Sequence, residues 1–184
     1  MKLSELKDCQ KKAELVYDAQ QISHALHMQA KDINSYLKTL SDCSEPALLL
    51  PVMNGGLIYA GQLLPLLNTP VQVDYLHATR YRNTTEGFDL EWKVYPQNDL
   101  SNRVVIILDD ILDEGHTLDA IVKYCKDKGA KTVLSAVLVT KLHDRRSKNL
   151  NVDFSALDVP DKYVFGYGMD YKGYLRNLDS IYAL

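Results

Sequence analysis

The chain has 184 residues, of which 46% are hydrophobic and 24% charged, a composition typical of ordinary globular proteins. This length suits one domain with a sizeable core and room for a small attached lobe. The formal charge of −3 provides no overall basic field, so we do not expect nucleic-acid binding.

The N-terminal residues carry charges every few positions, so they do not form the apolar centre of a signal peptide. No apolar run reaches the length of a membrane span, and we predict a cytoplasmic protein without a membrane partner. The cysteines, Cys9, Cys43 and Cys125, are odd in number and far apart, which argues against a disulfide framework or a zinc site.

The first part of the chain predicts a helix, a strand and a second helix. Residues 18–40 place apolar side chains near one helical face, behind Asp18 as a candidate N-cap. Residues 47–53 form a short apolar run typical of a buried parallel strand. This run ends at Asn54-Gly55-Gly56, after which the helical pattern resumes, so the sequence predicts a strand, a glycine turn and a helix.

The middle of the chain predicts a long hairpin. Residues 71–81 form one strand, residues 82–87 a polar tip, and residues 88–95 the returning strand. A loop of this length inside a compact domain is more often functional or disordered than decorative, so we expect a flexible loop with a role.

The second half continues the alternation. Residues 104–108 predict the strongest strand, residues 109–117 a loop, and residues 118–127 a helix that ends near a glycine. Residues 132–139 predict a further buried strand, and residues 161–165 are strand-like within a tail rich in turns.

Alternating buried strands and helices predict an α/β fold with a central parallel sheet and helices on both faces. Ligands of such sheets bind beyond the carboxyl ends of the strands. The candidate site residues therefore follow the apolar runs: Asn54-Gly55-Gly56, the segment around Arg80 and Tyr81, residues 109–117, and Lys141.

Residues 104–118 read VVIILDDILDEGHTL and combine three features with a chemical use. Gly115 turns the chain into a helix whose first N–H groups offer a phosphate site, to which Thr117 adds a hydroxyl. Asp109 and Asp110 suit ribose hydroxyls, directly or through a divalent cation. A solvated turn would explain one acid, but not four within six residues between an apolar strand and a helix start.

This segment resembles the phosphoribosyl-pyrophosphate signature of the purine phosphoribosyltransferases. Met53-Asn54-Gly55-Gly56 is similar to the family's pyrophosphate loop, and Lys141 to the lysine that recognises the purine 6-oxo group. Residues 160–178 resemble the C-terminal hood of the hypoxanthine-guanine branch. The resemblance implies a type I fold over residues 1–184, with a core at about 42–150 and a hood from parts of 1–41 and 151–184.

The resemblance implies an enzyme that joins hypoxanthine or guanine to the ribose of phosphoribosyl pyrophosphate, with Mg²⁺ as cofactor. Asp113 is then the general base at purine N7, and the residues implied as metal ligands are Asp109, Asp110 and Asp170. Relatives associate as dimers or tetramers, so a homodimer or homotetramer is expected. The residues implied as substrate contacts are Asn54, Gly55, Gly56, Arg80, Tyr81, Asp109, Asp110, Asp113, Glu114, Gly115, His116, Thr117, Lys141, Tyr163, Val164 and Arg176.

Two positions differ from the family's pattern. Asn54 stands where lysine is frequent, and Glu114-Gly115-His116-Thr117 stands where Thr-Gly-Lys-Thr is frequent. Backbone amides do most of the phosphate binding in these loops, so we expect activity to survive. The alternatives are a regulator of the same fold that binds without turnover, a phospho-acceptor receiver domain, and an enzyme that uses xanthine or adenine.

Overall fold

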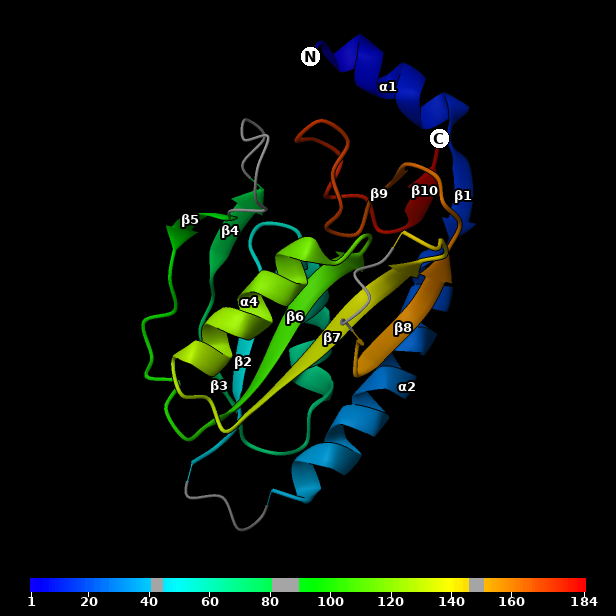
Figure 1. The fold of residues 1–184 in the computed structure, drawn as a ribbon. Helices are drawn as coiled ribbons and strands as arrows, with labels where there is room; N and C mark the ends of the chain where they lie inside the picture. The colour runs from blue at the N-terminus through cyan, green and yellow to red at the C-terminus, as the bar shows by residue number, and fades with distance from the viewer. Residues whose placement is uncertain (41–44, 81–89, 146–150) are drawn as a thin grey trace.

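The protein is built on a five-stranded parallel sheet with the strand order β3-β2-β6-β7-β8 (Figure 1). The computed structural model describes residues 1–40, 45–80, 90–145 and 151–184. All four pairings between neighbouring strands are parallel, which confirms the predicted α/β class. The strands are β2 (Leu48–Pro51), β3 (Gln72–Val73), β6 (Val104–Leu112), β7 (Thr132–Lys141) and β8 (Phe154–Val159).

Helices cover both faces of this sheet because its strands are apolar on both sides. Side chains alternate along β6, so that Ile106 packs on one face and Ile107 on the other. Two helices, α2 (Ala19–Lys38) and α3 (Gly56–Leu63), cover the face of Ile106, and α4 (His116–Asp127) covers the opposite face. A short 3₁₀ turn, Leu64–Leu66, follows α3.

The predicted helix at residues 18–40 is confirmed as α2. Asp18 caps it, because its carboxylate accepts a hydrogen bond from the backbone N–H of Gln21 at 2.8 Å. In return the side-chain oxygen of Gln21 accepts a hydrogen bond from the Asp18 N–H at 3.0 Å, which completes a capping box. No helix within the described ranges is long and apolar enough to cross a bilayer.

Two predicted boundaries are wrong. The strand predicted at 104–108 continues to Leu112, because Ile111 and Leu112 pair with β7 and the backbone ladder outweighs the polarity of the two acids before them. The single strand predicted at 71–81 is interrupted after β3. The Asp74 carboxylate accepts the backbone N–H groups of Gln97 and Asn98 there, while the N–H groups of Asp74 and Leu76 still donate to carbonyl oxygens of β2. The strand that follows, from His77, pairs with residues 90–94 instead.

The hairpin pairs β4 (His77–Arg80) with β5 (Leu90–Val94) in antiparallel register, as predicted. Its predicted tip lies outside the described residues. The hairpin and a second, smaller sheet extend beyond the carboxyl ends of the main strands (Figure 1). The small sheet joins the two ends of the chain, in the order β1 (Glu14–Tyr17), β10 (Ile181–Ala183) and β9 (Val164–Phe165).

The first seventeen residues form more structure than the sequence predicted. They contain α1 (Leu3–Lys12) as well as β1, neither of which was expected. In the strand-like stretch 161–165, only the last two residues are extended and paired, as β9. The small sheet and the main sheet together place the C-terminal segment close to the ends of β2 and β6.

Candidate active site

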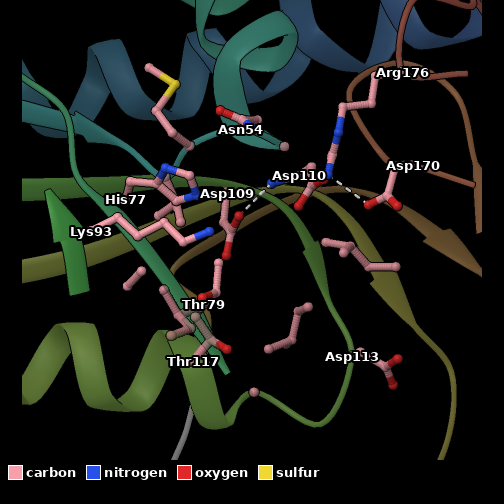
Figure 2. A pocket seen from close by; sticks show the side chains of 18 residues that line it. Asn54, His77, Thr79, Lys93, Asp109, Asp110, Asp113, Thr117, Asp170 and Arg176 are labelled. Atoms are coloured by element: carbon pink, nitrogen blue, oxygen red, sulfur yellow. Dashed lines mark hydrogen bonds and ion pairs between the residues drawn. The ribbon is translucent and has the colours of Figure 1, made fainter. Parts of the chain in front are cut away.

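A cavity of about 460 Å³ opens at the carboxyl ends of the main strands (Figure 2). Its walls come from the end of β6, the start of α4, the turn after β2, the β4–β5 hairpin and the C-terminal segment. This is the position at which parallel sheets bind ligands. The predicted site residues among its lining are Asn54, Gly55, Asp109, Asp110, Asp113, Gly115, Thr117, Asp170 and Arg176.

Asp109 and Asp110 form the floor of the cavity, where each is only 9% exposed. Burial raises the pKa of both carboxyl groups, and the charge of Asp110 raises the pKa of Asp109 further. Gly55 makes this arrangement possible, since a Cβ atom there would lie 2.0 Å from Oδ2 of Asp110. The preceding Met53–Asn54 peptide bond is cis.

Arg176 reaches the acidic floor from the C-terminal segment. Its guanidinium donates to Oδ1 of Asp170 at 2.7 Å and to the carbonyl oxygen of Gly168 at 2.6 Å. Nη1, the nitrogen that donates to Gly168, also lies 3.9 Å from Oδ2 of Asp110. Arg176 thus places a positive charge beside the buried carboxylate of Asp110 (Figure 2).

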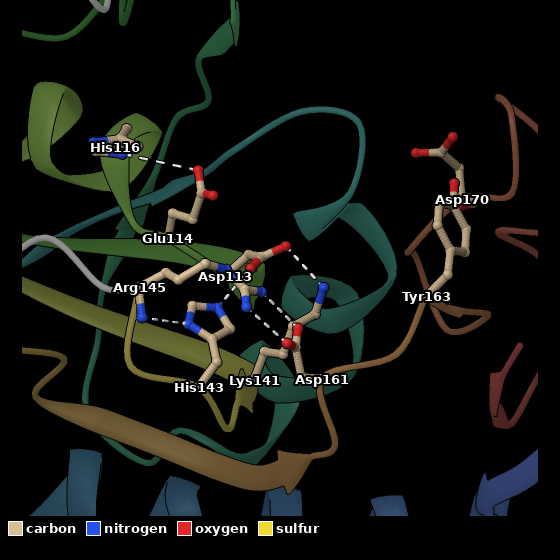
Figure 3. A network of polar contacts seen from close by, with 9 residues as sticks. All are labelled: Asp113, Glu114, His116, Lys141, His143, Arg145, Asp161, Tyr163 and Asp170. Atoms are coloured by element: carbon tan, nitrogen blue, oxygen red, sulfur yellow. Dashed lines mark hydrogen bonds and ion pairs between the residues drawn. The ribbon is translucent and has the colours of Figure 1, made fainter.

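Asp113 lies one residue beyond the end of β6. Leu112 is in register with Thr140 on the neighbouring strand, so Asp113 and Lys141 are carried to the same place. Lys141 donates from Nζ to Oδ2 of Asp113 at 2.8 Å, and His143 contacts Oδ1 at 2.7 Å (Figure 3). Burial raises the pKa of Asp113, but these two hydrogen bonds outweigh it, and the pKa lies below its ordinary value.

The start of α4 has the geometry of an anion site. Gly115 is its N-cap with φ of 87°, a left-handed conformation that glycine adopts without steric cost. Gly115 and Thr117 both line the cavity, so the first N–H groups of the helix lie at its edge. Between them His116 lies 3.8 Å from Glu114, and neither of these two side chains is part of the cavity wall.

The remaining predicted residues are not brought to the cavity wall. Lys141 contacts Asp113, which lines the wall, without lining it itself. Val164 belongs to the small sheet and Tyr163 directly precedes it, at a distance from Asp113 in Figure 3. Tyr163 is 48% exposed, and its hydroxyl donates to the carbonyl oxygen of Asp170 at 3.0 Å. Gly56 has a packing role, since a Cβ there would lie 2.6 Å from the carbonyl oxygen of Leu108.

The hairpin also contributes residues that the sequence reasoning missed: His77, Thr79 and Lys93 line the cavity. The side chain of Arg80 and all of Tyr81 lie outside the described part of the chain, so their predicted contacts stay predictions. Burial lowers the pKa of His77, as do the positive charges of Lys93 and Arg176. Alternation along β4 would not have found the missed residues, because Ala78 also lines the cavity and the register shifts between His77 and Ala78.

Known proteins are similar to this chain in sequence and in fold. A family model described as the phosphoribosyl transferase domain matches residues 16–172. A hypoxanthine-guanine phosphoribosyltransferase of Bacillus subtilis is 32% identical over 139 residues, which cover 74% of this chain and 76% of that protein. The protein of the same name from Aquifex aeolicus is 28% identical over 175 residues and covers 95% of this chain and 96% of its own length.

Solved structures agree in fold. A hypoxanthine phosphoribosyl transferase of Trypanosoma cruzi superposes with a TM-score of 0.87 at 22% identity, over 93% of this chain and 90% of that one. A hypoxanthine phosphoribosyltransferase of Staphylococcus aureus reaches a TM-score of 0.84, also at 22% identity, with the same coverage of both chains. The fold is therefore shared with these proteins.

Proposed function

The chain belongs to the phosphoribosyltransferase family, and on this premise we propose that it transfers the phosphoribosyl group of phosphoribosyl pyrophosphate to hypoxanthine or guanine. In this reaction a purine nitrogen attacks the anomeric carbon of the ribose, and pyrophosphate leaves with the electrons of the broken bond. The observation that carries the proposal is the meeting of Asp113 and Lys141, 2.8 Å apart, beside a cavity floored by two acids.

The sugar phosphate fits along β6 and into the start of α4. Asp109 and Asp110 would accept hydrogen bonds from the ribose hydroxyls. Residues 114–117 would bind the 5′-phosphate through backbone N–H groups and the hydroxyl of Thr117, where the helix dipole favours negative charge. In this arrangement Asp109 and Asp110 lie at the sugar and not at the phosphate.

Pyrophosphate would lie between the turn after β2 and Arg176. Asn54 and Gly55 offer backbone N–H groups there, and Arg176 offers a charge already oriented by Asp170. The N–H of Gly56 donates to the carbonyl oxygen of Val52 and holds the turn in place. Lys93 lines the same cavity from the hairpin and adds a positive charge where Asn54 supplies none. Arg80 and Tyr81 would close over the reactants as part of the hairpin, which would exclude water from the reacting carbon.

Asp113 would take the proton from purine N7 as the purine nitrogen bonds to the ribose. Its lowered pKa keeps the carboxylate ionised at neutral pH, the form that accepts a proton. Lys141 would leave Asp113 and donate to the 6-oxo group of the base. A carbonyl at this position accepts that hydrogen bond and an amino group does not, which favours 6-oxopurines over adenine. Tyr163 would stack on the base, and Val164 would meet its edge with backbone groups.

The donor set fits a divalent cation in part. Asp109 and Asp110 are adjacent and buried, which raises their pKa values, and a nearby positive charge would stabilise their ionised forms. Their oxygen atoms are ligands of the kind that Mg²⁺ prefers. Within the described ranges no three acidic, histidine or cysteine side chains are grouped to hold a metal, so the chain itself offers at most Asp109 and Asp110, with Asp170 held by Arg176. Mg²⁺ would neutralise the charge of the leaving pyrophosphate.

The enzyme is favoured over a regulator of the same fold. The relatives that match most of the chain bear the names of enzymes, and Asp113 is present and oriented by two donors. A cytoplasmic location and a homodimer or homotetramer stay predictions from the sequence.

The test is release of pyrophosphate from phosphoribosyl pyrophosphate and Mg²⁺, with hypoxanthine, guanine, xanthine and adenine each supplied alone. We expect turnover with the first two bases and a strong loss in Asp113→Asn, whose amide cannot accept the N7 proton. Removal of Mg²⁺ by a chelator is expected to stop turnover. Binding of phosphoribosyl pyrophosphate without turnover of any base would favour the regulator instead.

A further inference from the structure

His143 is a buried histidine that the reaction outlined above does not use. Its side chain is 3% exposed, and Nε2 lies 2.7 Å from Oδ1 of Asp113. It follows β7 by two residues, in the same turn that carries Lys141 to Asp113 (Figure 3). A ring buried in contact with the proposed general base is placed to act on it.

The hydrogen bonds of the ring determine its tautomer. The backbone N–H of Arg145 donates to Nδ1 at 3.1 Å, so Nδ1 must present a lone pair. The proton of a neutral imidazole is then on Nε2, which donates it to Asp113. A proton on Nδ1 would oppose two N–H groups to each other, so this geometry keeps Nδ1 as an acceptor and Nε2 as the donor.

The turn that holds His143 is fixed at its far end. The guanidinium of Arg145 donates to both oxygens of Asp161, at 2.9 Å and 2.7 Å. The position of the Arg145 backbone, and with it the orientation of the imidazole, is therefore held by a bidentate ion pair. The charged groups around Asp113 are Lys141, Arg145, Asp161 and Glu114.

Asp113 uses a different oxygen for each of its two donors. Oδ2 accepts from Lys141 and Oδ1 accepts from His143. When Lys141 turns to the 6-oxo group of a base, Oδ2 loses its donor, and the contact with His143 remains. Without His143 the carboxylate would then have nothing among these partners to fix its rotation at the moment of proton transfer.

We propose that His143 is a positioning residue that holds Oδ1 of Asp113 as a neutral donor and so directs Oδ2 to the N7 proton of the purine. The inference rests on the proposed function, because it takes Asp113 as the proton acceptor. The proton passes from N7 to Oδ2 and His143 keeps its own. Base recognition and general-base catalysis are thereby coupled, since the lysine that leaves Asp113 is the one that binds the base.

The test compares His143→Gln and His143→Leu in the full chain with phosphoribosyl pyrophosphate, Mg²⁺ and hypoxanthine. The Gln side chain carries an amide N–H about where Nε2 lies, whereas Leu fills the space without a donor. Loss of a hydrogen bond to a charged group predicts a fall in kcat of about tenfold to a hundredfold in His143→Leu, with most of it restored in His143→Gln. The control is His27→Gln, at an exposed position of α2.

The pH profile separates positioning from a merely structural role. His143 helps to lower the pKa of Asp113, so its loss should move the acidic limb of kcat/KM to higher pH, and Gln should move it back. Thermal unfolding establishes that each variant is folded. An unshifted acidic limb in a folded His143→Leu, or equal losses in the two variants, would overturn the inference. Absence of turnover in the unsubstituted chain would instead refute the proposed function.

Discussion

Gly55 offers a direct test of how closely the cavity is built. Its backbone has φ of −61° and ψ of −47°, a helical conformation that alanine adopts without strain. A Cβ atom at this position would lie 2.0 Å from Oδ2, 2.4 Å from Cγ and 2.7 Å from Oδ1 of Asp110. Gly55→Ala therefore acts on the carboxylate of Asp110 and leaves the backbone of residue 55 unstrained.

The size of the effect follows from the displacement. Ordinary contact of a Cβ atom begins at 3.4 Å, so the Asp110 carboxylate has to withdraw by roughly 1 Å or more. A misplacement of this order in a catalytic site costs about a hundredfold in rate. We expect kcat/KM for phosphoribosyl pyrophosphate to fall by about that factor in Gly55→Ala, with the protein still folded.

Gly61 is the matched control, because it lies in α3 on the same segment and a Cβ there would meet nothing within 4 Å. Gly61→Ala should keep full activity and stabilise the helix by about 0.5–1 kcal/mol, which raises Tm by up to about 4 °C. Steady-state kinetics and thermal unfolding of both variants make the comparison. Unchanged kcat/KM in Gly55→Ala would refute the steric argument.

Three further predictions concern the acids, the lysine and the core. Burial raises the pKa of Asp110, so ionisation of this carboxyl group destabilises the folded state as pH rises above about 4. Asp110→Asn should therefore raise Tm at neutral pH, measured by thermal unfolding, and should abolish most turnover. Lys141→Met should lower kcat/KM for guanine by about tenfold to a hundredfold and shift its acidic limb to higher pH, as the Asp113 pKa rises. Tyr59→Phe leaves Oε1 of buried Gln29 without its 2.8 Å donor and should cost about 1–3 kcal/mol in urea unfolding.

Local patterns predicted the parts of the fold that local physics determines. The apolar runs at 47–53 and 132–139 predicted strands because strands covered on both faces have few polar residues. The glycine turns after residues 53 and 114 predicted where helices begin. The strand at 104–108 was predicted too short, because the polarity of Asp109 and Asp110 was taken as its end. Pairing with β7 extends this strand to Leu112, and the sequence of the strand itself does not indicate that pairing.

The sequence predicted those cavity residues that lie within the family motif. It missed residues whose place in the cavity depends on contacts between distant parts of the chain. His143 stands in a polar stretch, Leu-His-Asp-Arg, which reads as a solvated turn. Its role depends on Asp113, thirty residues earlier, and the two meet only through the register of β6 and β7. Lys93 was missed for the same reason, since its place in the cavity follows from the pairing of β5 with β4.

Asp110 is the point at which three distant segments meet. Gly55 lies against its carboxylate, and a Cβ at Gly168 would lie 2.3 Å from the carbonyl oxygen of Gly55 and 3.9 Å from Cβ of Asp110. Arg176 donates to the carbonyl oxygen of Gly168 and faces the same carboxylate. Because the two glycines allow backbone to approach this closely, the acid is buried and its pKa is raised. The same close approach brings the guanidinium of Arg176, which offsets this charge, so the electrostatics at Asp110 follow from the packing of the glycines.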